Sequence, residues 1–187
     1  LRIVSSRSFK DRYETQVAVT TLATSHERGL MVAGCSDGQL RLLDSALREV
    51  GTVPSHKGGV ASMSISHDGM LIATTGYSSR LTKNKDSSIL YAFPDPTIYI
   101  YDIRRLGQAG IPHRFAGAPA SPRHVAFLPD IPNLAVSNRL VVASGQAAGG
   151  LQLLVPLETE VDLTNSFIVP PLQPGEAISA LAQAEDD

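Results

Sequence analysis

Apolar and polar positions alternate in short runs along the whole chain. The apolar runs are rich in β-branched residues, and Gly, Asp, Ser or Pro interrupts them about every 8 to 12 residues, a spacing typical of an all-β protein. Leu40 and Leu42 share one face of one run, and Ile98 and Ile100 share one face of another. We expect these faces to pack between neighbouring sheets. No window keeps the spacing of an amphipathic helix over three turns, so we expect few helices.

The alternating pattern also repeats. Residues 17–44 and 60–102 each contain a strand, a polar turn, a strand ending in Gly, a second turn and a strand ending in an apolar residue and Asp. Gly34 and Gly76 hold equivalent places 42 residues apart, which is within the repeat length of propeller blades. A weaker third copy and the start of a fourth follow at residues 123–127, 140–145, 151–155 and 177–181.

Two Asp-Gly pairs mark the sharpest turns. Asp37-Gly38 separates two apolar runs of the first copy, and Asp68-Gly69 separates two runs of the second. Gly tolerates a positive φ because it has no Cβ, so Asp-Gly between alternating runs is a strong hairpin signal. We therefore predict a β-hairpin at each pair.

These segments resemble the WD-repeat β-propeller family. The resemblance rests on Ser36–Asp44, Ile65–Gly76 and Thr97–Asp102, with Leu43-Asp44 and Tyr101-Asp102 standing where the family has Trp-Asp. It implies an all-β WD-repeat propeller fragment of about three four-stranded blades, which cannot close a ring of about 4 to 8 blades alone. The predicted blades cover residues 15–56, 57–118 and 119–172, with partial blades at 1–14 and 173–187.

A narrower resemblance concerns the second and third copies. Gly76–Thr82, Ile98–Arg105, Val125–Pro129 and Val142–Gln146 are similar to the N-terminal propeller of the catalytic subunit of the poly(A)-nuclease deadenylase complex. The chain departs from that family by a longer insertion at residues 83–96.

That resemblance implies a scaffold whose chemistry lies elsewhere. In the family, the propeller helps to position an adaptor subunit and the substrate, which is poly(A) mRNA carrying poly(A)-binding protein. A separate four-carboxylate domain is the poly(A)-specific 3'-5' exoribonuclease and uses a divalent metal, Mg²⁺. For this chain the resemblance predicts no enzyme activity, no cofactor and a cytoplasmic location. The alternatives are a generic WD-repeat interaction scaffold in an unrelated complex and a propeller enzyme whose site lies in other blades.

The composition of the chain excludes further classes of protein. The chain has 187 residues, a net charge of −2 and one cysteine, which excludes an internal disulfide framework and a cysteine-built zinc site. Its apolar stretches are too short to span a membrane, and we expect a reduced, intracellular protein. All 16 basic residues lie at or before Arg139, and seven acids with no Lys or Arg follow. This asymmetry fits either two surfaces with different partners or simple solubility.

Candidate catalytic groups are few. Ser66-His67-Asp68 contains the residue types of a hydrolytic triad, but adjacent residues point in different directions, so we predict a hairpin turn. Cys35 follows an apolar run and is expected to be a small packing residue. The histidines occur singly, without the spacing of metal ligands. His26, His56 and His67 fall in predicted loops, where we expect solvated or turn-stabilising side chains.

The remaining candidates are binding residues. Residues 77–96 are predicted as a 20-residue loop, long enough to suggest a functional role, and its aromatic second half is predicted to lie as a strap against the propeller. The basic and aromatic side chains of this loop would suit binding to RNA or to an acidic partner. Alternatively, the loop is a solvated insertion that contacts nothing. Arg104 and Arg105, further along the chain, are either solvated edge residues or part of one basic face with Arg80. The predicted binding residues are Tyr77, Arg80, Lys83, Lys85, Arg104 and Arg105.

Overall fold

The chain forms antiparallel β-sheets, as the alternating pattern predicts. A computed structural model describes residues 8–10, 16–26, 28–84, 87–105, 113–116, 122–128, 140–144 and 151–154. The predicted fourth copy at 177–181 and the acidic residues from Glu158 onward lie outside these residues. The only helix within them is a three-residue 3-10 helix, η1 (Ile103–Arg105).

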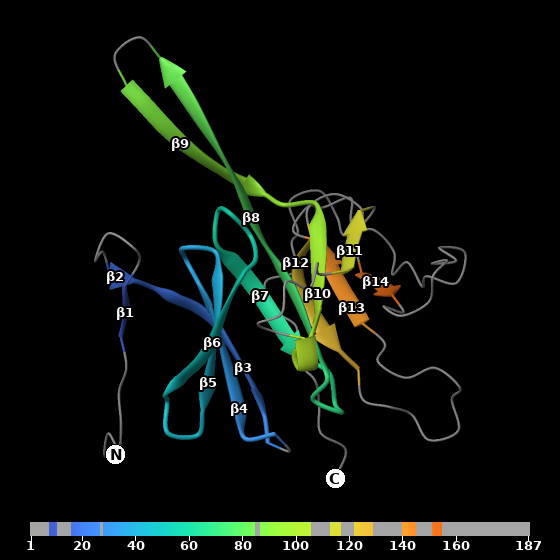
Figure 1. Ribbon diagram of the computed structural model, residues 1–187. Helices are drawn as coiled ribbons and strands as arrows, with labels where there is room; N and C mark the ends of the chain where they lie inside the picture. The colour runs from blue at the N-terminus through green and yellow to red at the C-terminus, as the bar shows by residue number, and fades with distance from the viewer. Residues whose placement is uncertain are drawn as a thin grey trace, which may run out of the picture.

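The described residues contain fourteen strands (Figure 1). Their bounds are β1 (Phe9–Lys10), β2 (Gln16–Val17), β3 (Val19–Ser25), β4 (Leu30–Cys35), β5 (Gln39–Asp44), β6 (Glu49–Pro54), β7 (Val60–Ile65), β8 (Leu71–Asn84), β9 (Ser87–Pro94), β10 (Thr97–Asp102), β11 (His113–Ala116), β12 (Pro122–Phe127), β13 (Leu140–Ser144) and β14 (Leu151–Leu154).

Three larger sheets follow one another along the chain. The first has the strand order β3-β4-β5-β6, the second β7-β8-β10-β11 with β9 paired to β8, and the third β12-β13-β14. Side chains link the first strands of successive sheets. The Thr20 hydroxyl donates to the Val60 carbonyl at 2.6 Å, and the Ser64 hydroxyl accepts from the Phe127 amide at 3.0 Å. The sheets therefore pack side by side through their first strands, as propeller blades do.

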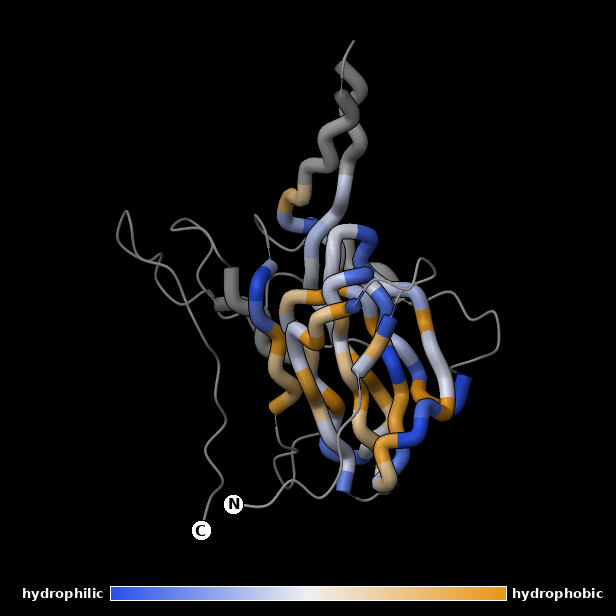
Figure 2. Tube along the Cα trace, turned by 90° about the vertical axis from the view of Figure 1, so that its left-hand side faces the viewer, coloured by the Kyte–Doolittle hydropathy of each residue, from blue (hydrophilic) through white to orange (hydrophobic). Residues whose placement is uncertain are grey.

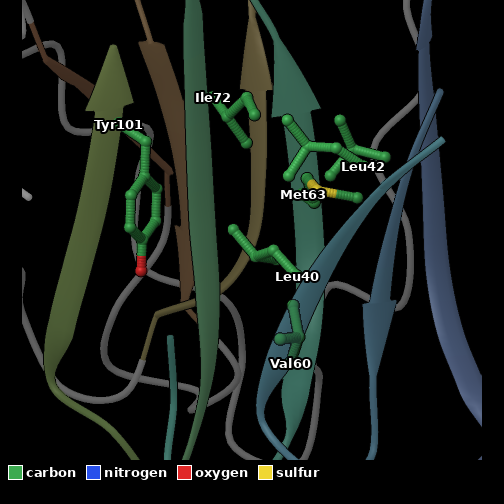
Figure 3. Close-up of a cluster of buried hydrophobic side chains, with 7 residues drawn as sticks. Leu40, Leu42, Val60, Met63, Ile72 and Tyr101 are labelled. Carbon is green, nitrogen blue, oxygen red and sulfur yellow. The ribbon is translucent and has the colours of Figure 1, made fainter. Parts of the chain in front are cut away.

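Apolar side chains fill the spaces between these sheets. Leu40 and Leu42 of the first sheet pack against Val60, Met63 and Ile72 of the second (Figure 3). Burial of side chains of this size stabilises the fold by roughly 1.5 to 3 kcal/mol each. Figure 2 shows the hydrophobic positions concentrated on the strands of the packed sheets and the hydrophilic ones toward their ends.

The second interface repeats this arrangement. Ile98 and Ile100 of the second sheet pack against Val125 and Phe127 of the third. The prediction that both alternating faces lie between neighbouring sheets is confirmed.

The opposite face of the first sheet packs against the small β1-β2 sheet. Phe9 and Val17 form a cluster there with Ala33, Cys35 and Leu43. Cys35 is fully buried, so its predicted packing role is confirmed. Burial raises the pKa of its thiol, which disfavours the reactive thiolate.

Both Asp-Gly pairs form the predicted hairpin turns. Gly38 has a φ of 79° and Gly69 a φ of 65°. In each turn the Asp side chain accepts a bond from the backbone amide two residues on, at 3.1 Å for Asp37 and 2.9 Å for Asp68. The second turn includes the Ser66-His67-Asp68 sequence, in which His67 is exposed. The prediction that this sequence forms a hairpin turn rather than a catalytic triad is confirmed.

Alanine substitutions at Gly38 and at Gly29 should distinguish the cost of an unfavourable backbone conformation from the cost of steric overlap. Gly38 and Gly29 both have positive φ, but a methyl group at Gly38 would overlap the carbonyl oxygen of His56, whereas none of the described atoms lies near one at Gly29. We expect Gly29→Ala to lower the free energy of unfolding by about 1 kcal/mol. Gly38→Ala should lower it by about 3 kcal/mol, since overpacking adds roughly 1 to 3. Urea unfolding of both variants measures this difference, and equal losses would contradict it.

Candidate interaction site

The segment predicted as a loop is a β-hairpin. β8 continues past its sheet, and its outer part pairs with β9 from Tyr77↔Pro94 to Asn84↔Ser87. We call residues 77–84 and 87–94 the arm, and Figure 1 shows it projecting away from the packed sheets. The predictions of a loop and of a strap against the propeller are therefore wrong. The physical reason is that β9 contains Ile89, Tyr91 and Phe93, which have high β-propensity. Pairing with β8 also satisfies backbone groups along the facing edges of both strands.

The base of the arm is bonded to the loop between β6 and β7. The Tyr77 amide donates to the Gly59 carbonyl at 2.8 Å, and the Gly58 amide donates to the Tyr77 carbonyl at 2.6 Å. On the returning strand, the Asp95 amide donates to the Gly76 carbonyl at 3.0 Å. These bonds hold both strands of the arm at the point where they leave the sheet.

A buried histidine lies beneath these bonds. His56 lies in the loop between β6 and β7, as predicted, but it has no exposed surface. Of the two predicted alternatives, a solvated side chain is therefore wrong. Its Nδ1 is 3.2 Å from a carboxylate oxygen of Asp95, and its Nε2 is 3.2 Å from the hydroxyl of Thr74. The ring also contacts that of Tyr99, with centroids 4.6 Å apart. Asp95 follows β9 and Thr74 lies in β8, so this network ties both strands of the arm to one loop.

The same arrangement has the residue types of a hydroxyl, histidine and carboxylate triad. Catalysis by such a triad requires that the hydroxyl reach a substrate, and Thr74, like His56, is fully buried. Burial lowers the pKa of His56, although the hydrogen bond and charge of Asp95 oppose this. The network therefore contains a neutral imidazole, and its role is structural rather than catalytic. Sequence reasoning missed it, although His56 lies shortly before the second copy and Asp95 shortly before the last strand of that copy.

The lowered pKa of His56 predicts a stability that depends on pH. Below its ordinary pKa of 6.5, the unfolded chain takes up a proton at His56 that the folded chain does not. Stability is thus fully present above pH 6.5 and falls as the pH drops toward the lowered pKa, by up to about 1.4 kcal/mol per pH unit. Urea unfolding between pH 7.5 and 5 should show this slope, and His56→Asn should flatten it. An equal slope in the variant would assign the effect to other groups.

The structure places three of the six predicted binding residues in the arm. Tyr77 lies at its base and is half-buried, and Arg80 and Lys83 lie in β8, in register with Tyr91 and Ser88. Lys85 lies outside the described residues. Their role in binding stays a prediction.

The other two predicted residues lie at the far end of the sheet. Arg104 and Arg105 are in η1, directly after the Asp102↔Leu71 pair. Leu71 and Arg80 are nine residues apart in β8, or about 30 Å along an extended strand. The prediction that the arginines join Arg80 in one basic face is therefore wrong, because β10 runs antiparallel to β8 and carries them to its opposite end.

The charge of those arginines is also compensated locally. The Arg104 guanidinium donates to both carboxylate oxygens of Asp102, at 2.9 and 2.6 Å. This hydrogen bonding lowers the pKa of Asp102 to about 2. Within the part of the chain that the structure describes, three or more His, Cys, Asp or Glu residues nowhere gather as metal ligands. In the same part, no helix is long and apolar enough to cross a membrane.

Comparison with known proteins supports the propeller fold. Residues 47–102 match the family model described as WD domain, G-beta repeat. No curated protein matches the sequence. Among solved structures 436 chains match, so the likeness concerns a widespread fold.

Three of these structures illustrate the likeness. A chain of a mitotic checkpoint complex has a TM-score of 0.56 and 18% identity over 79% of this chain and 38% of that chain. The Neurospora crassa Pan2 WD40 domain has a TM-score of 0.55 and 22% identity over 82% of this chain and 40% of its own. The Cps50 (Swd1) β-propeller domain of Myceliophteria thermophila has a TM-score of 0.56 and 12% identity over 88% and 40%. This chain thus spans about two fifths of each.

The chain therefore contains a WD40 repeat and has the fold of a WD-repeat β-propeller. Proteins of this class are in general non-catalytic scaffolds that mediate contacts between proteins. At these identities the solved structures define the fold and not the particular protein.

Proposed function

We propose that the chain is the scaffold propeller of a poly(A)-specific deadenylase subunit. This subunit would act on messenger RNA in the cytoplasm. The observation that carries this proposal is the resemblance of Gly76–Thr82 and Ile98–Arg105 to that family. In the structure these two segments lie in β8 and in β10 with η1. A Pan2 WD40 domain among the structural neighbours is consistent with the proposal.

In this function the chain positions other components. Its rigid sheets would hold the adaptor subunit near poly(A) mRNA and its poly(A)-binding protein. Hydrolysis would belong to a metal-dependent nuclease domain of the parent protein. The buried Thr74–His56–Asp95 network fits this division of labour, because it stabilises the fold and does not face a substrate.

Affinity capture of the tagged full-length protein from its own cells tests the proposal. The captured material is incubated with an RNA that ends in a poly(A) tail and with a matched RNA that ends in a poly(U) tail, in Mg²⁺ and in EDTA. We expect Mg²⁺-dependent shortening of the poly(A) tail from its 3' end and an adaptor subunit in the captured complex. The purified 187-residue chain should shorten neither RNA. Capture of the intact protein without tail shortening above a tag-only control would overturn the proposal.

The alternative is a WD-repeat scaffold of an unrelated complex. The other two structural neighbours, from a mitotic checkpoint complex and Cps50 (Swd1), favour it as much as the Pan2 domain favours a deadenylase, since all three have similar TM-scores. A stable captured complex without poly(A)-shortening activity would support this alternative.

A further inference from the structure

We propose that the outer edge of β9 in the arm is a docking site for an extended segment of a partner protein, in which apolar and acidic residues alternate. The partner segment would add to the arm as a third strand. This inference goes beyond the proposed function and does not depend on which complex contains the chain.

The backbone of β9 carries the first part of the argument. Among the described residues, β9 pairs with β8 alone. The neighbouring strand β11 pairs with β10, and its described register ends at Thr97↔Ala116, below the arm. One edge of an eight-residue strand therefore has no described partner for its amide and carbonyl groups. An added strand would bond these groups directly, which is the main source of affinity in strand addition.

The composition of β9 carries the second part. Its sequence, Ser-Ser-Ile-Leu-Tyr-Ala-Phe-Pro, has no charged residue and five consecutive apolar ones from Ile89 to Phe93. Phe93 is 44% exposed. Soluble proteins usually protect an edge strand with charges, bulges or a covering segment, because an uncharged apolar edge invites pairing with other chains. Since β9 has no charged residue, we infer that the edge is used for pairing.

Charge selects the kind of partner. The arm contains two basic residues, Arg80 and Lys83, and no acidic residue. At the base, exposed Lys57 lies beside the arm, because its carbonyl accepts a bond from the Ser79 hydroxyl at 3.3 Å. An acidic segment is attracted to this region. RNA bases stack on aromatic rings, and β9 has two of these, Tyr91 and Phe93. Its other apolar residues, Ile89, Leu90 and Ala92, suit contact with an apolar strand, and its outer backbone edge suits strand pairing.

The fixed base of the arm makes docking more favourable. Both strands of the arm are bonded where they leave the sheet, and the buried His56–Asp95 contact lies beneath them. A binding element held in place loses less conformational entropy when its partner binds. The arm is thus a preformed template rather than a segment that must fold on binding.

A shortened arm provides the central test. Replacing residues 80–91 by Asn-Gly would close the Ser79↔Ala92 pair with a two-residue turn suited to hairpins, and it leaves Tyr77 and Asp95 in place. Random twelve-residue peptides displayed on phage are selected on the full-length protein and counter-selected on the shortened variant. Binding of the resulting synthetic peptides is measured by fluorescence anisotropy. Urea unfolding of the shortened variant checks that the sheets remain folded.

Point variants sharpen the test. Leu90→Asp in β9 should weaken binding of the selected peptides about tenfold or more, through a lost apolar contact and charge repulsion. Val50→Asp is the matched control, because Val50 is a 60% exposed apolar residue in β6, the outer strand of another sheet, and it should leave binding unchanged. The double variant Arg80→Glu, Lys83→Glu should weaken binding by a similar factor, and more so at low salt.

The expected result is a set of arm-dependent peptides with alternating apolar and acidic residues. Three results would overturn the proposal. The first is the absence of arm-dependent peptides. The second is a selected set without acidic residues, or one that binds the Leu90→Asp variant as well as the unchanged protein. The third is a labelled poly(A) oligonucleotide whose binding is lost with the arm while peptide binding persists, which would assign the arm to RNA.

Discussion

Replacing His56 by alanine should lower the free energy of unfolding by about 3 to 5 kcal/mol. The imidazole is fully buried and contacts the carboxylate of Asp95 and the hydroxyl of Thr74, both at 3.2 Å. Its removal would leave both groups without this partner and create a cavity. An unsatisfied buried polar group costs about 1 to 3 kcal/mol, and truncation of a large buried side chain commonly costs 2 kcal/mol or more. Urea unfolding followed by circular dichroism measures the change.

His26→Ala is the matched control for this variant. His26 lies in an exposed turn between β3 and β4, and substitutions at such positions usually change stability by less than about 0.5 kcal/mol. A loss below about 1 kcal/mol for His56→Ala, or equal losses for both variants, would contradict the role that we assign to the buried network. Because the network joins the base of the arm, we also expect faster amide exchange at Tyr77 in the His56→Ala variant.

Replacing Arg41 by alanine should cost about 3 kcal/mol. Its guanidinium makes two bonds to the carboxylate of Asp37, at 3.0 and 2.6 Å, and its side chain is only 7% exposed. Its Cζ also lies 5.1 Å from the centroid of the Phe9 ring. Removing one partner of a buried pair leaves an uncompensated charge, which commonly costs about 3 to 5 kcal/mol, and we take the lower end because Asp37 retains some exposure.

Arg48→Ala tests whether burial is the cause. Arg48 forms an ion pair with Asp44 at the same sequence spacing, at 2.7 Å, but its side chain is 78% exposed. Exposed pairs contribute roughly 0 to 1 kcal/mol because water and salt screen them. Urea unfolding should therefore separate the two arginine variants by about 2 kcal/mol or more. Similar losses would mean that the buried environment of Arg41 adds nothing to its ion pair.

The strands and turns of the packed sheets follow from local pattern. Alternation predicts which side of a strand is apolar, and Leu40 and Ile98 both lie at sheet interfaces as expected. Asp-Gly predicts tight turns because the backbone there needs a positive φ, which Gly38 and Gly69 have. Each of these features depends on residues close together in the chain.

The candidate site was predicted less well. Residues 77–96 are predicted as a long loop with a binding role, whereas β8 and β9 pair within this segment and form the arm. Arg80 and Arg104 were assigned to one face, yet they lie toward opposite ends of β8 because β10 is antiparallel to it. Local composition contains no information on which strand pairs with which end.

The all-β class, the repeat, the hairpin turns and the apolar faces can be predicted from the sequence, because they depend on backbone preferences and on alternation over a few residues. The burial of His56 depends on long-range contacts, since Asp95, 39 residues further on, and Thr74, 18 residues further on, lie against its ring. The path of the arm away from the sheet, with a β9 edge that is unpaired among the described residues, also depends on strand pairing between distant segments. Such contacts join distant segments, and their free energy depends on burial and pairing that no local pattern records.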